Sequence, residues 1–238
     1  MTEGAEPKAA LAETEKRLAA EASSLLVADG MKVGLGTGST VAYLLPALAA
    51  RRLDITCVAT SVRTEAEARR LGLDVVSFSG SAAEAGPGGG LAHLDIAIDG
   101  SDQVTPDLWL IKGGGGAHTR EKIVARAADR FVVIVSSEKL VERLSPPVPL
   151  ELLSFGLKAT MRALGELGEC RLRDCPPSPD GGVIADYFGP IADRRALAEH
   201  FEATPGVVGH GLFPPEMVAT VLVGHAGAAV EELVARPS

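Results

Sequence analysis

The feature that most constrains the fold is an alternation between short apolar runs and segments with helical spacing. After a predicted first helix over residues 6–29, the apolar runs predict five strands: 31–36, 55–60, 73–78, 94–98 and 131–135. The segments 39–52 and 64–71 between them predict helices. This alternation is typical of βαβ units around a buried parallel sheet, and right-handed crossovers place helices on both faces. We therefore expect an α/β fold with a mainly parallel sheet.

The pattern changes at residues 145–149 (SPPVP), where three prolines in five residues mark a boundary. Beyond it the sequence predicts a small α+β unit: a strand running into a helix over 150–167, a strand at 182–187, a helix at 194–202 and a strand at 207–213. The run 218–223 is expected to rejoin the large sheet. We predict a large domain of residues 1–144 and 217–238 and a small domain of residues 145–216. The glycine-rich segment 80–90 is predicted to be a mobile surface insertion.

Composition narrows the class of protein. The chain has 238 residues, 46% of them apolar, and 23 basic against 31 acidic side chains give a net charge of −8. The apolar content excludes an intrinsically disordered chain, and the negative charge argues against a general nucleic-acid binder. No apolar run reaches the length that crosses a membrane, and residues 1–21 lack the apolar core of a signal peptide. Three sparse cysteines predict neither disulfides nor zinc, so we expect a cytoplasmic protein.

The first candidate site is GLGTGST (34–40), where a predicted strand turns into a helix. Glycines let the backbone approach a ligand there, and the helix N-terminus offers N–H donors to an anion. Ser39 and Thr40 add hydroxyl donors, so the turn suits a phosphate group. The spacing fits neither the dinucleotide fingerprint nor the P-loop, and a tight strand–helix connection without a ligand is the alternative.

The second candidate site is DGSD (99–102), which directly follows the apolar run LDIAI. The carboxyl end of a central strand is where open α/β sheets bind ligands. Two carboxylates three residues apart, Asp99 and Asp102, can both turn toward a crevice. The alternative is ordinary turn chemistry at the end of a strand.

The third candidate site contains four consecutive glycines, 113–116, between Lys112 and a predicted helix that begins near Thr119. Glycine lowers stability through lost backbone entropy, so four together are hard to explain as filler. The run predicts a backbone cradle for an anion or a sugar. Glu121, nine positions after Lys112, could face the same crevice from the first turn of the helix. Its alternative role is to complement the helix dipole or a capping box.

All three motifs follow predicted parallel strands, so we expect them to gather at one edge of the sheet. Together they supply phosphate donors, carboxylates and a cation, an inventory that suits proton transfer next to a carbonyl on a phosphorylated sugar. The five histidines are scattered without ligand spacing, so no metal site is predicted: His93, His118, His200, His210 and His225.

The strings GLGTGST (34–40), DGSD (99–102), LIKGGGGAHTREKIVA (110–125) and TPGVVGHGLF (204–213) together resemble the type A family of ribose-5-phosphate isomerases. Weaker similarity runs over nearly the whole chain. The resemblance implies a large Rossmann-like domain and a smaller α+β, ferredoxin-like domain, in a homodimer or a dimer of dimers. It implies an aldose–ketose isomerase of the non-oxidative pentose phosphate pathway that interconverts ribose 5-phosphate and ribulose 5-phosphate without a metal or other cofactor.

The resemblance also implies roles for matching positions. Glu121 would be the general base that moves a proton between C2 and C1 through a cis-enediolate, and Lys112 would stabilise that intermediate. Asp99 and Asp102 would help to open the sugar ring, with Asp99 as the proton shuttle. The implied substrate-binding residues are Lys16, Thr37, Gly38, Ser39, Thr40, Asp99, Gly100, Ser101, Asp102, Lys112, Gly113, Gly114, Gly115 and Lys139.

Three positions depart from the family pattern. Ser101 and Gln103 stand where the family more often has Ala and Glu, and His118 stands where an apolar residue is usual. Gln103 removes a charge just past the acid pair, and His118 changes the packing behind the proposed base.

Two other classes of protein share this sheet architecture. A sugar-phosphate sensor of a transcription regulator would carry a separate DNA-binding unit, and we expect none here, because the roughly 30 residues before the first strand predict a single helix. A sugar-phosphate deaminase, a lactonase or an acyl-CoA transferase would lack the KGGGGA…REK string, and its products would identify it.

Overall fold

The computed structural model describes residues 5–78, 91–227 and 229–234, which fall into two compact units. Unit 1 comprises Met1–Gly100, Ile123–Lys139 and Glu216–Ser238, and unit 2 comprises Ser101–Lys122 and Leu140–Pro215. The segment 80–90, predicted to be a mobile insertion, lies outside the described residues. The predicted domain boundaries stay a prediction.

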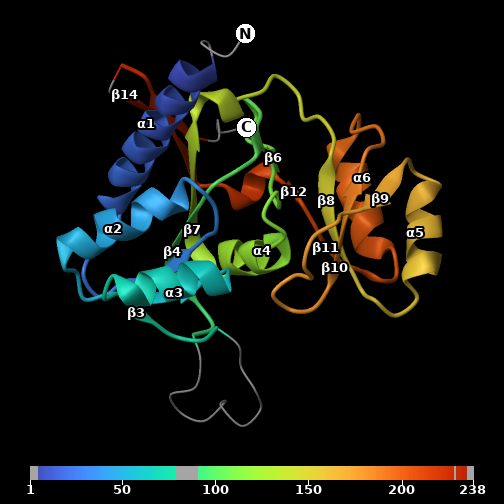
Figure 1. Ribbon diagram of the computed structural model, residues 1–238, viewed down its shortest axis with the longest axis horizontal. Coiled ribbons are helices and arrows are strands. Elements are labelled where there is room, and N and C mark those ends of the chain that lie inside the picture. Colours follow the sequence, from blue (N-terminus) through green and yellow to red (C-terminus); the bar gives the residue numbers. More distant parts are fainter. Residues whose placement is uncertain (1–4, 79–90, 228, 235–238) are drawn as a thin grey trace. The chain divides into compact units, whose positions relative to one another are not determined.

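Unit 1 is built on a sheet that has seven strands within the described residues, in the order β14-β13-β7-β4-β1-β2-β3. Figure 1 labels β14, β7, β4 and β3 of this sheet. Neighbouring strands in it run parallel, apart from the antiparallel pair β13 and β14. The strands are β1 (Lys32–Leu35), β2 (Thr56–Ala59), β3 (Asp74–Val75), β4 (Leu94–Asp99), β7 (Ala128–Ser136), β13 (Thr220–His225) and β14 (Ala229–Val234). The parallel part has the doubly wound order, whose direction reverses between β1 and β4. The expectation that 218–223 rejoins the large sheet is confirmed.

Helices cover both faces of this sheet, as predicted. They are α1 (Ala5–Ser24), α2 (Val41–Arg51), α3 (Val62–Arg70) and α4 (His118–Arg126), with a 3-10 turn η1 (Ser137–Lys139) after β7. Val33 and Leu35 of β1 lie in one buried cluster with Ala20 of α1 and Leu44 of α2. Side chains alternate along a strand, so Gly34 points to the other face, where an added methyl group would press against Val124 of α4.

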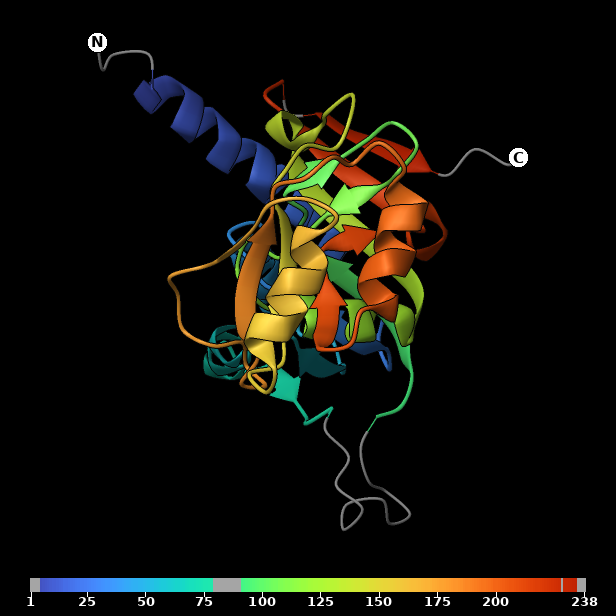
Figure 2. The ribbon, with the colours of Figure 1, turned by 90° about the vertical axis from the view of Figure 1, so that its right-hand side faces the viewer.

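Unit 2 contains a four-stranded antiparallel sheet, among the described residues, in the order β11-β8-β10-β9. Its elements follow in the chain as β8 (Val148–Leu152), α5 (Leu157–Gly165), β9 (Cys170–Leu172), β10 (Val183–Tyr187), α6 (Arg194–Ala203) and β11 (Val207–His210). Figure 2 shows α5 (yellow) and α6 (orange) on the same face of this sheet. Their buried residues, such as Leu164 and Phe201, pack with Leu150 and Tyr187 of the strands. This order of strands and helices is the ferredoxin-like arrangement that the resemblance implied.

A second, three-stranded sheet in unit 2 corrects one expectation. It has the order β12-β6-β5 among the described residues, with β5 (Gln103–Val104), β6 (Leu110–Ile111) and β12 (Leu212–Phe213) paired antiparallel. The prediction that all three motifs follow parallel strands of one sheet is therefore wrong for the glycine run, which follows β6. A short apolar run indicates a buried strand but does not identify its partners. The predicted strand 207–213 is likewise divided between β11 and β12, in different sheets.

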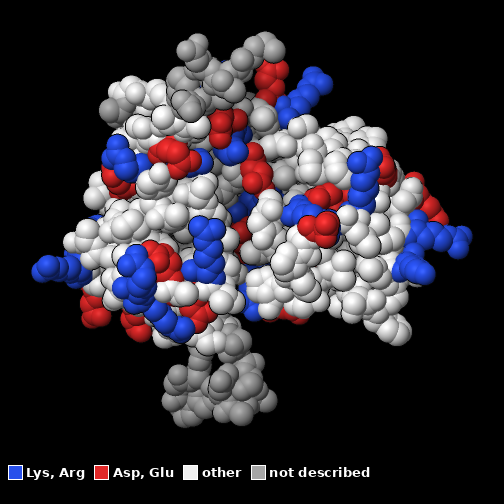
Figure 3. Space-filling model, viewed as in Figure 1, with Lys and Arg blue, Asp and Glu red and all other residues white. Residues whose placement is uncertain are grey.

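Charged side chains of both signs occur on the face of the molecule that Figure 3 shows. Among the described residues on the face in Figure 3, Lys and Arg side chains (blue) are interspersed with Asp and Glu side chains (red) rather than gathered into one basic area. None of the described helices has both the length and the apolar character needed to cross a bilayer. Two helices begin with a side-chain cap: Ser61 accepts from Thr64 N at the start of α3, and Asp193 accepts from Ala196 N at the start of α6.

Candidate active site

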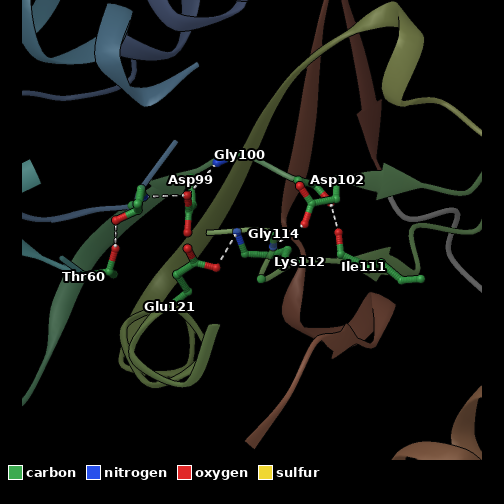
Figure 4. Close-up of polar contacts among 12 residues, drawn as sticks. Thr60, Asp99, Gly100, Asp102, Ile111, Lys112, Gly114 and Glu121 are labelled. Atoms are coloured by element: carbon green, nitrogen blue, oxygen red, sulfur yellow. Dashed lines mark hydrogen bonds and ion pairs between the residues drawn. The ribbon is translucent and has the colours of Figure 1, made fainter. Parts of the chain in front are cut away.

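In unit 1, the first two predicted motifs meet where β1 and β4 end. The two strands are parallel neighbours with Leu35 opposite Ile98, so Gly36 and Asp99 emerge side by side. The buried Asp99 carboxylate accepts hydrogen bonds from Thr37 N (3.0 Å) and Gly100 N (2.7 Å), and Figure 4 shows it with Gly100. Any side chain at Gly36 would overlap this carboxylate, so the glycine is required by a close approach. The structure therefore places Asp99 at the switch point of the sheet, where doubly wound folds bind ligands.

Two threonines that sequence reasoning missed complete this corner. The hydroxyl oxygens of Thr37 and Thr60 lie 2.8 Å apart, and the Thr64 hydroxyl donates to Gly36 O at 3.0 Å. Thr60 and Thr64 both follow β2, whose carboxyl end lies at the same edge as those of β1 and β4. The sequence predicted β2 and its direction correctly, so the position of these threonines at the end of β2 could have identified them.

The rest of the first motif leads into α2. Gly38 and Ser39 are exposed, and Thr40 is the buried residue directly before the helix. Exposed backbone and a hydroxyl at a helix N-terminus are the groups that bind an anion in such turns. The geometry is thus compatible with the predicted phosphate contact, which stays a prediction.

Two more predicted residues, Lys16 and Lys139, lie on segments of unit 1 that are joined by a buried carboxylate. Glu15 of α1 accepts hydrogen bonds from Ser137 N (2.9 Å) and from the Ser137 hydroxyl (2.8 Å). Lys16 donates to Glu13 at 2.6 Å, and Lys139 lies 3.4 Å from Glu138. The structure therefore brings the two lysine-bearing segments together, with each lysine beside a carboxylate of its own segment.

In unit 2, Lys112 and Glu121 form a buried ion pair. Lys112 Nζ lies 3.1 Å from Glu121 Oε2, with only 3% and 4% of the two side chains exposed (Figure 4). Lys112 directly follows β6, and Glu121 lies in the first turn of α4, where its N–H donates to Ala117 O. Lys112 Nζ also lies 5.6 Å from the centre of the Phe213 ring. The nine-residue spacing thus places a carboxylate and an ammonium group next to each other, as the sequence predicted.

The glycine run between them is ordered by the second acid of the DGSD motif. Gly114 N donates to Asp102 Oδ2 at 2.8 Å, and Asp102 N donates to Ile111 O at 2.9 Å (Figure 4). Gly113 has φ +104°, which disfavours any other residue. The Ser101 hydroxyl, predicted to bind substrate, donates to the backbone oxygens of Gln103 and Ile111.

His118, one of the departures from the family pattern, is fully buried beneath the glycine run. A side chain at Gly113 would come within 2.7 Å of its Nδ1. Burial, helped by the positive charges of Lys122, Arg173 and Lys112, lowers the pKa of His118 to about 4. The imidazole is therefore neutral near pH 7, so this position still presents an uncharged side chain to the loop.

The predicted site residues thus form two described groups, one in each unit. Unit 1 holds Lys16, Thr37, Gly38, Ser39, Thr40, Asp99, Gly100 and Lys139, and unit 2 holds Ser101, Asp102, Lys112, Gly113, Gly114, Gly115 and Glu121. The peptide bond between Gly100 and Ser101 links the groups directly. Their convergence on one substrate stays a prediction.

Sequence reasoning also missed Arg173, whose guanidinium donates to Gly113 O and Gly114 O. It lies about 60 positions further along the chain, after a strand that no periodicity singled out, so the sequence carried no signal for it.

No metal ligands were predicted, and one group of possible ligands occurs among the described residues. The ligand atoms of His93, Asp95 and Asp129 lie within 4.8 Å of one another. His93 Nε2 is 3.1 Å from Asp129 Oδ2, and Asp95 Oδ2 accepts from Lys32 N, so these atoms already have protein partners. They lie at the amino ends of β4 and β7, the opposite end of the strands from Asp99.

Each group contains side chains of the kind that proton transfer at carbon requires. A buried carboxylate beside a buried ammonium group can move a proton while the cation and backbone N–H groups stabilise a developing oxyanion. The acid at the switch point can exchange a second proton. None of these groups needs a redox cofactor for such chemistry.

Known proteins share both the sequence and the fold. Residues 56–228 match the sequence model of the family described as ribose 5-phosphate isomerase A (phosphoriboisomerase A). The ribose-5-phosphate isomerase A of Roseiflexus sp. (strain RS-1) is 43% identical over 226 residues, covering 89% of this chain and 93% of its own. The structure of ribose 5-phosphate isomerase A from Methanocaldococcus jannaschii superimposes with a TM-score of 0.82 at 36% identity, covering 92% and 97% of the two chains. A D-ribose-5-phosphate isomerase in complex with phospho-erythronic acid superimposes with a TM-score of 0.83 at 32% identity, covering 94% and 99%.

Proposed function

The chain belongs to the ribose 5-phosphate isomerase A family, and on this premise we propose that it interconverts ribose 5-phosphate and ribulose 5-phosphate. The observation that carries the proposal is the buried pair of Lys112 and Glu121 beside the glycine run. An aldose–ketose isomerisation moves one proton between neighbouring carbons, and this pair combines a base with a stabilising cation.

Glu121 is the general base of the proposed reaction. Its carboxylate removes the proton from C2 of the open-chain aldose, which leaves a cis-enediolate, and returns the proton to C1 to give the ketose. The hydroxyl proton on O2 moves to O1 in the enediolate, so that C2 becomes the carbonyl carbon and C1 carries the hydroxyl group. No external oxidant is needed, since C1 is reduced as C2 is oxidised. A positioned base of this kind contributes about 10²–10⁴-fold to the rate.

Lys112 and the N–H groups of the glycine run stabilise the negative charge that develops on the enediolate oxygens. Lys112 is only 2% exposed, so its charge acts where little water competes. Stabilisation of this type amounts to about 2.7–4 kcal/mol for each well-placed donor.

Asp99 and Asp102 assist the opening of the sugar ring before the proton transfer. Asp99 is the proton shuttle for the ring oxygen and the anomeric hydroxyl, held in place by the N–H groups of Thr37 and Gly100. The N-terminus of α2, with Thr37, Gly38, Ser39 and Thr40, contacts the phosphate together with Lys16 and Lys139. No metal takes part in these steps.

The wider setting is part of the same proposal. The chain acts as a cytoplasmic homodimer or dimer of dimers in the non-oxidative pentose phosphate pathway, on a small sugar phosphate rather than on nucleic acid or a membrane.

The proposal is tested by incubating the protein with ribose 5-phosphate and identifying the products. We expect ribulose 5-phosphate to form with the wild type and with Glu166→Gln, a control that alters an exposed carboxylate of unit 2. Glu121→Gln should form no measurable ketose. Release of ammonia from an amino sugar phosphate, hydrolysis of a sugar lactone or transfer of coenzyme A, without ketose formation, would contradict the proposal and assign the chain to a related class of enzyme.

A further inference from the structure

Arg173 forms a network that joins the small sheet of unit 2 to the glycine run. It follows β9 directly, and its Nε donates to Asp186 Oδ2 of β10 at 2.9 Å while its Nη2 donates to Asp186 Oδ1. The remaining nitrogen, Nη1, donates to Gly113 O at 3.1 Å and to Gly114 O at 3.0 Å. A single guanidinium therefore contacts a carboxylate on one side and two consecutive loop carbonyls on the other.

The pair with Asp186 fixes the orientation of the guanidinium. Two parallel hydrogen bonds between planar groups set the plane of the arginine fork, which a lysine cannot reproduce. The side chains are 21% and 14% exposed, so water screens the pair only in part. The hydrogen bonds to Asp186 raise the pKa of Arg173, which keeps it charged at any working pH.

Because the peptide bond is planar, a contact that holds a carbonyl group also sets the direction of the N–H group that follows it. In a trans peptide the C=O and the following N–H point in opposite directions. The carbonyl of Gly113 points to Arg173, and the N–H of Gly114 accordingly points away and donates to Asp102 at 2.8 Å. The carbonyl of Gly114 also points to Arg173, so the N–H of Gly115 must point away from Arg173 as well.

We propose that Arg173 is a positioning residue for the isomerisation: by holding the carbonyls of Gly113 and Gly114, it directs the Gly115 N–H toward a substrate oxygen that becomes negatively charged. This inference rests on the proposed function. Glycine leaves the backbone of the loop conformationally free, and Gly113 and Gly116 both have positive φ values. Asp102 holds the N–H of Gly114, and the carbonyl of Gly113 also accepts from Gly116 N at 3.0 Å. Arg173 adds the contact to the Gly114 carbonyl, which sets the direction of the Gly115 N–H.

The test compares variants of Arg173 with a control on β9, the strand that precedes it. Arg173→Met removes the donors but keeps much of the side-chain volume, and Arg173→Lys keeps the charge but loses the fork. Arg171→Met is the control, because Arg171 pairs with the exposed Glu169 and not with the loop. Each variant is assayed for kcat and KM with ribose 5-phosphate, and hydrogen exchange of the amides of residues 113–116 is measured without substrate.

We expect Arg173→Met to lower kcat by about 10-fold to 100-fold, with KM changed by less than about threefold, because a donor to the transition state is misdirected. Amide exchange in residues 113–116 should accelerate in Arg173→Met and Arg173→Lys but not in Arg171→Met. Arg173→Ala should regain activity when methylguanidinium is added, which loss of folding would not permit.

Two results would overturn the inference: kcat of Arg173→Met within about twofold of an active wild type, or unchanged amide exchange in residues 113–116. The exchange measurement uses no substrate, so it decides whether Arg173 orders the loop independently of activity. A wild type that forms no ketose contradicts the proposed function itself, and with it the catalytic purpose assigned to Arg173.

Discussion

Lys112 and Glu121 are two charged side chains almost completely removed from water in unit 2. Burying such a pair costs free energy, because the hydration energy that both charges lose can exceed the electrostatic attraction between them. Apolar residues of similar size would often be as stable, so a buried pair next to a glycine run is better explained by chemistry than by stability. His118 lies buried beneath the same run without a charge, because burial keeps its imidazole neutral.

Replacing the lysine of this pair should affect turnover more than binding. Lys112→Met retains the aliphatic stem but removes the cation 3.1 Å from Glu121. We expect kcat to fall by about 10²-fold to 10³-fold, because the lost contact strengthens as the enediolate forms. Steady-state kinetics with ribose 5-phosphate measure the effect, with Lys158→Met, an exposed lysine of α5, as control. A rise in KM with unchanged kcat would contradict this role.

His118 should make the stability of the protein depend on pH. Its pKa is about 4 in the folded protein and 6.5 in a model peptide, so the unfolded chain binds the extra proton first as the pH falls. The free energy of unfolding should therefore decrease between pH 7 and pH 4, by about 3 kcal/mol from this group alone. Urea unfolding at several pH values measures it. His118→Leu should show a correspondingly smaller decrease, and an equal decrease in both proteins would refute the assignment.

Among the elements, the turn from β1 into α2 shows what a sequence can and cannot specify. GLGTGST identified the turn, and LDIAI followed by Asp99 identified the neighbouring strand end. Their parallel pairing explains why Gly36 cannot carry a side chain, since the Asp99 carboxylate occupies that space. The two-residue strand β6 was identified too, but its antiparallel partners were not, because pairing depends on residues distant in the chain.

Gly36→Ala should therefore disturb the acid rather than the helix. The added methyl group overlaps Asp99, and overpacking of this kind destabilises a protein by about 1–3 kcal/mol. We expect a lower midpoint in thermal unfolding and a fall in kcat of about 10-fold or more, since Asp99 must move. Gly165→Ala is the control, because a methyl group there meets open space. Wild-type activity in Gly36→Ala would show that the position of Asp99 is not critical.

For the whole molecule, the spacing of apolar residues and the positions of glycine and proline predicted most of the helices and strands. The parallel sheet of unit 1 and the α+β character of unit 2 were predicted from the succession of strands and helices. The ferredoxin-like arrangement came from the family resemblance, because no periodicity singled out β9. Contacts between distant residues did not follow, such as Arg173 with Gly113 and Gly114, or Glu15 with Ser137. A side-chain hydrogen bond over 60 or 122 positions leaves no periodic trace in one sequence, so only the folded chain reveals it.

The intact enzyme should need no divalent cation. The chemistry assigned to Glu121, Lys112 and Asp99 uses side chains alone, and the possible ligands His93, Asp95 and Asp129 lie at the opposite end of the strands from Asp99. Assays after prolonged treatment with EDTA should give the kcat of untreated protein. Inactivation that is reversed by adding back a divalent metal would show that the mechanism is incomplete.

The central claim is that the Glu121 carboxylate carries the proton between C2 and C1. It is tested most directly by following ribose 5-phosphate in D2O by NMR with the wild type and Glu121→Gln, which reports ketose formation and loss of the C2 hydrogen together. The wild type should do both, and Glu121→Gln should lower both rates by at least about 10²-fold to 10⁴-fold while its thermal unfolding still shifts upward with ribose 5-phosphate. Ketose formation and C2 exchange at near wild-type rates in Glu121→Gln would contradict the account.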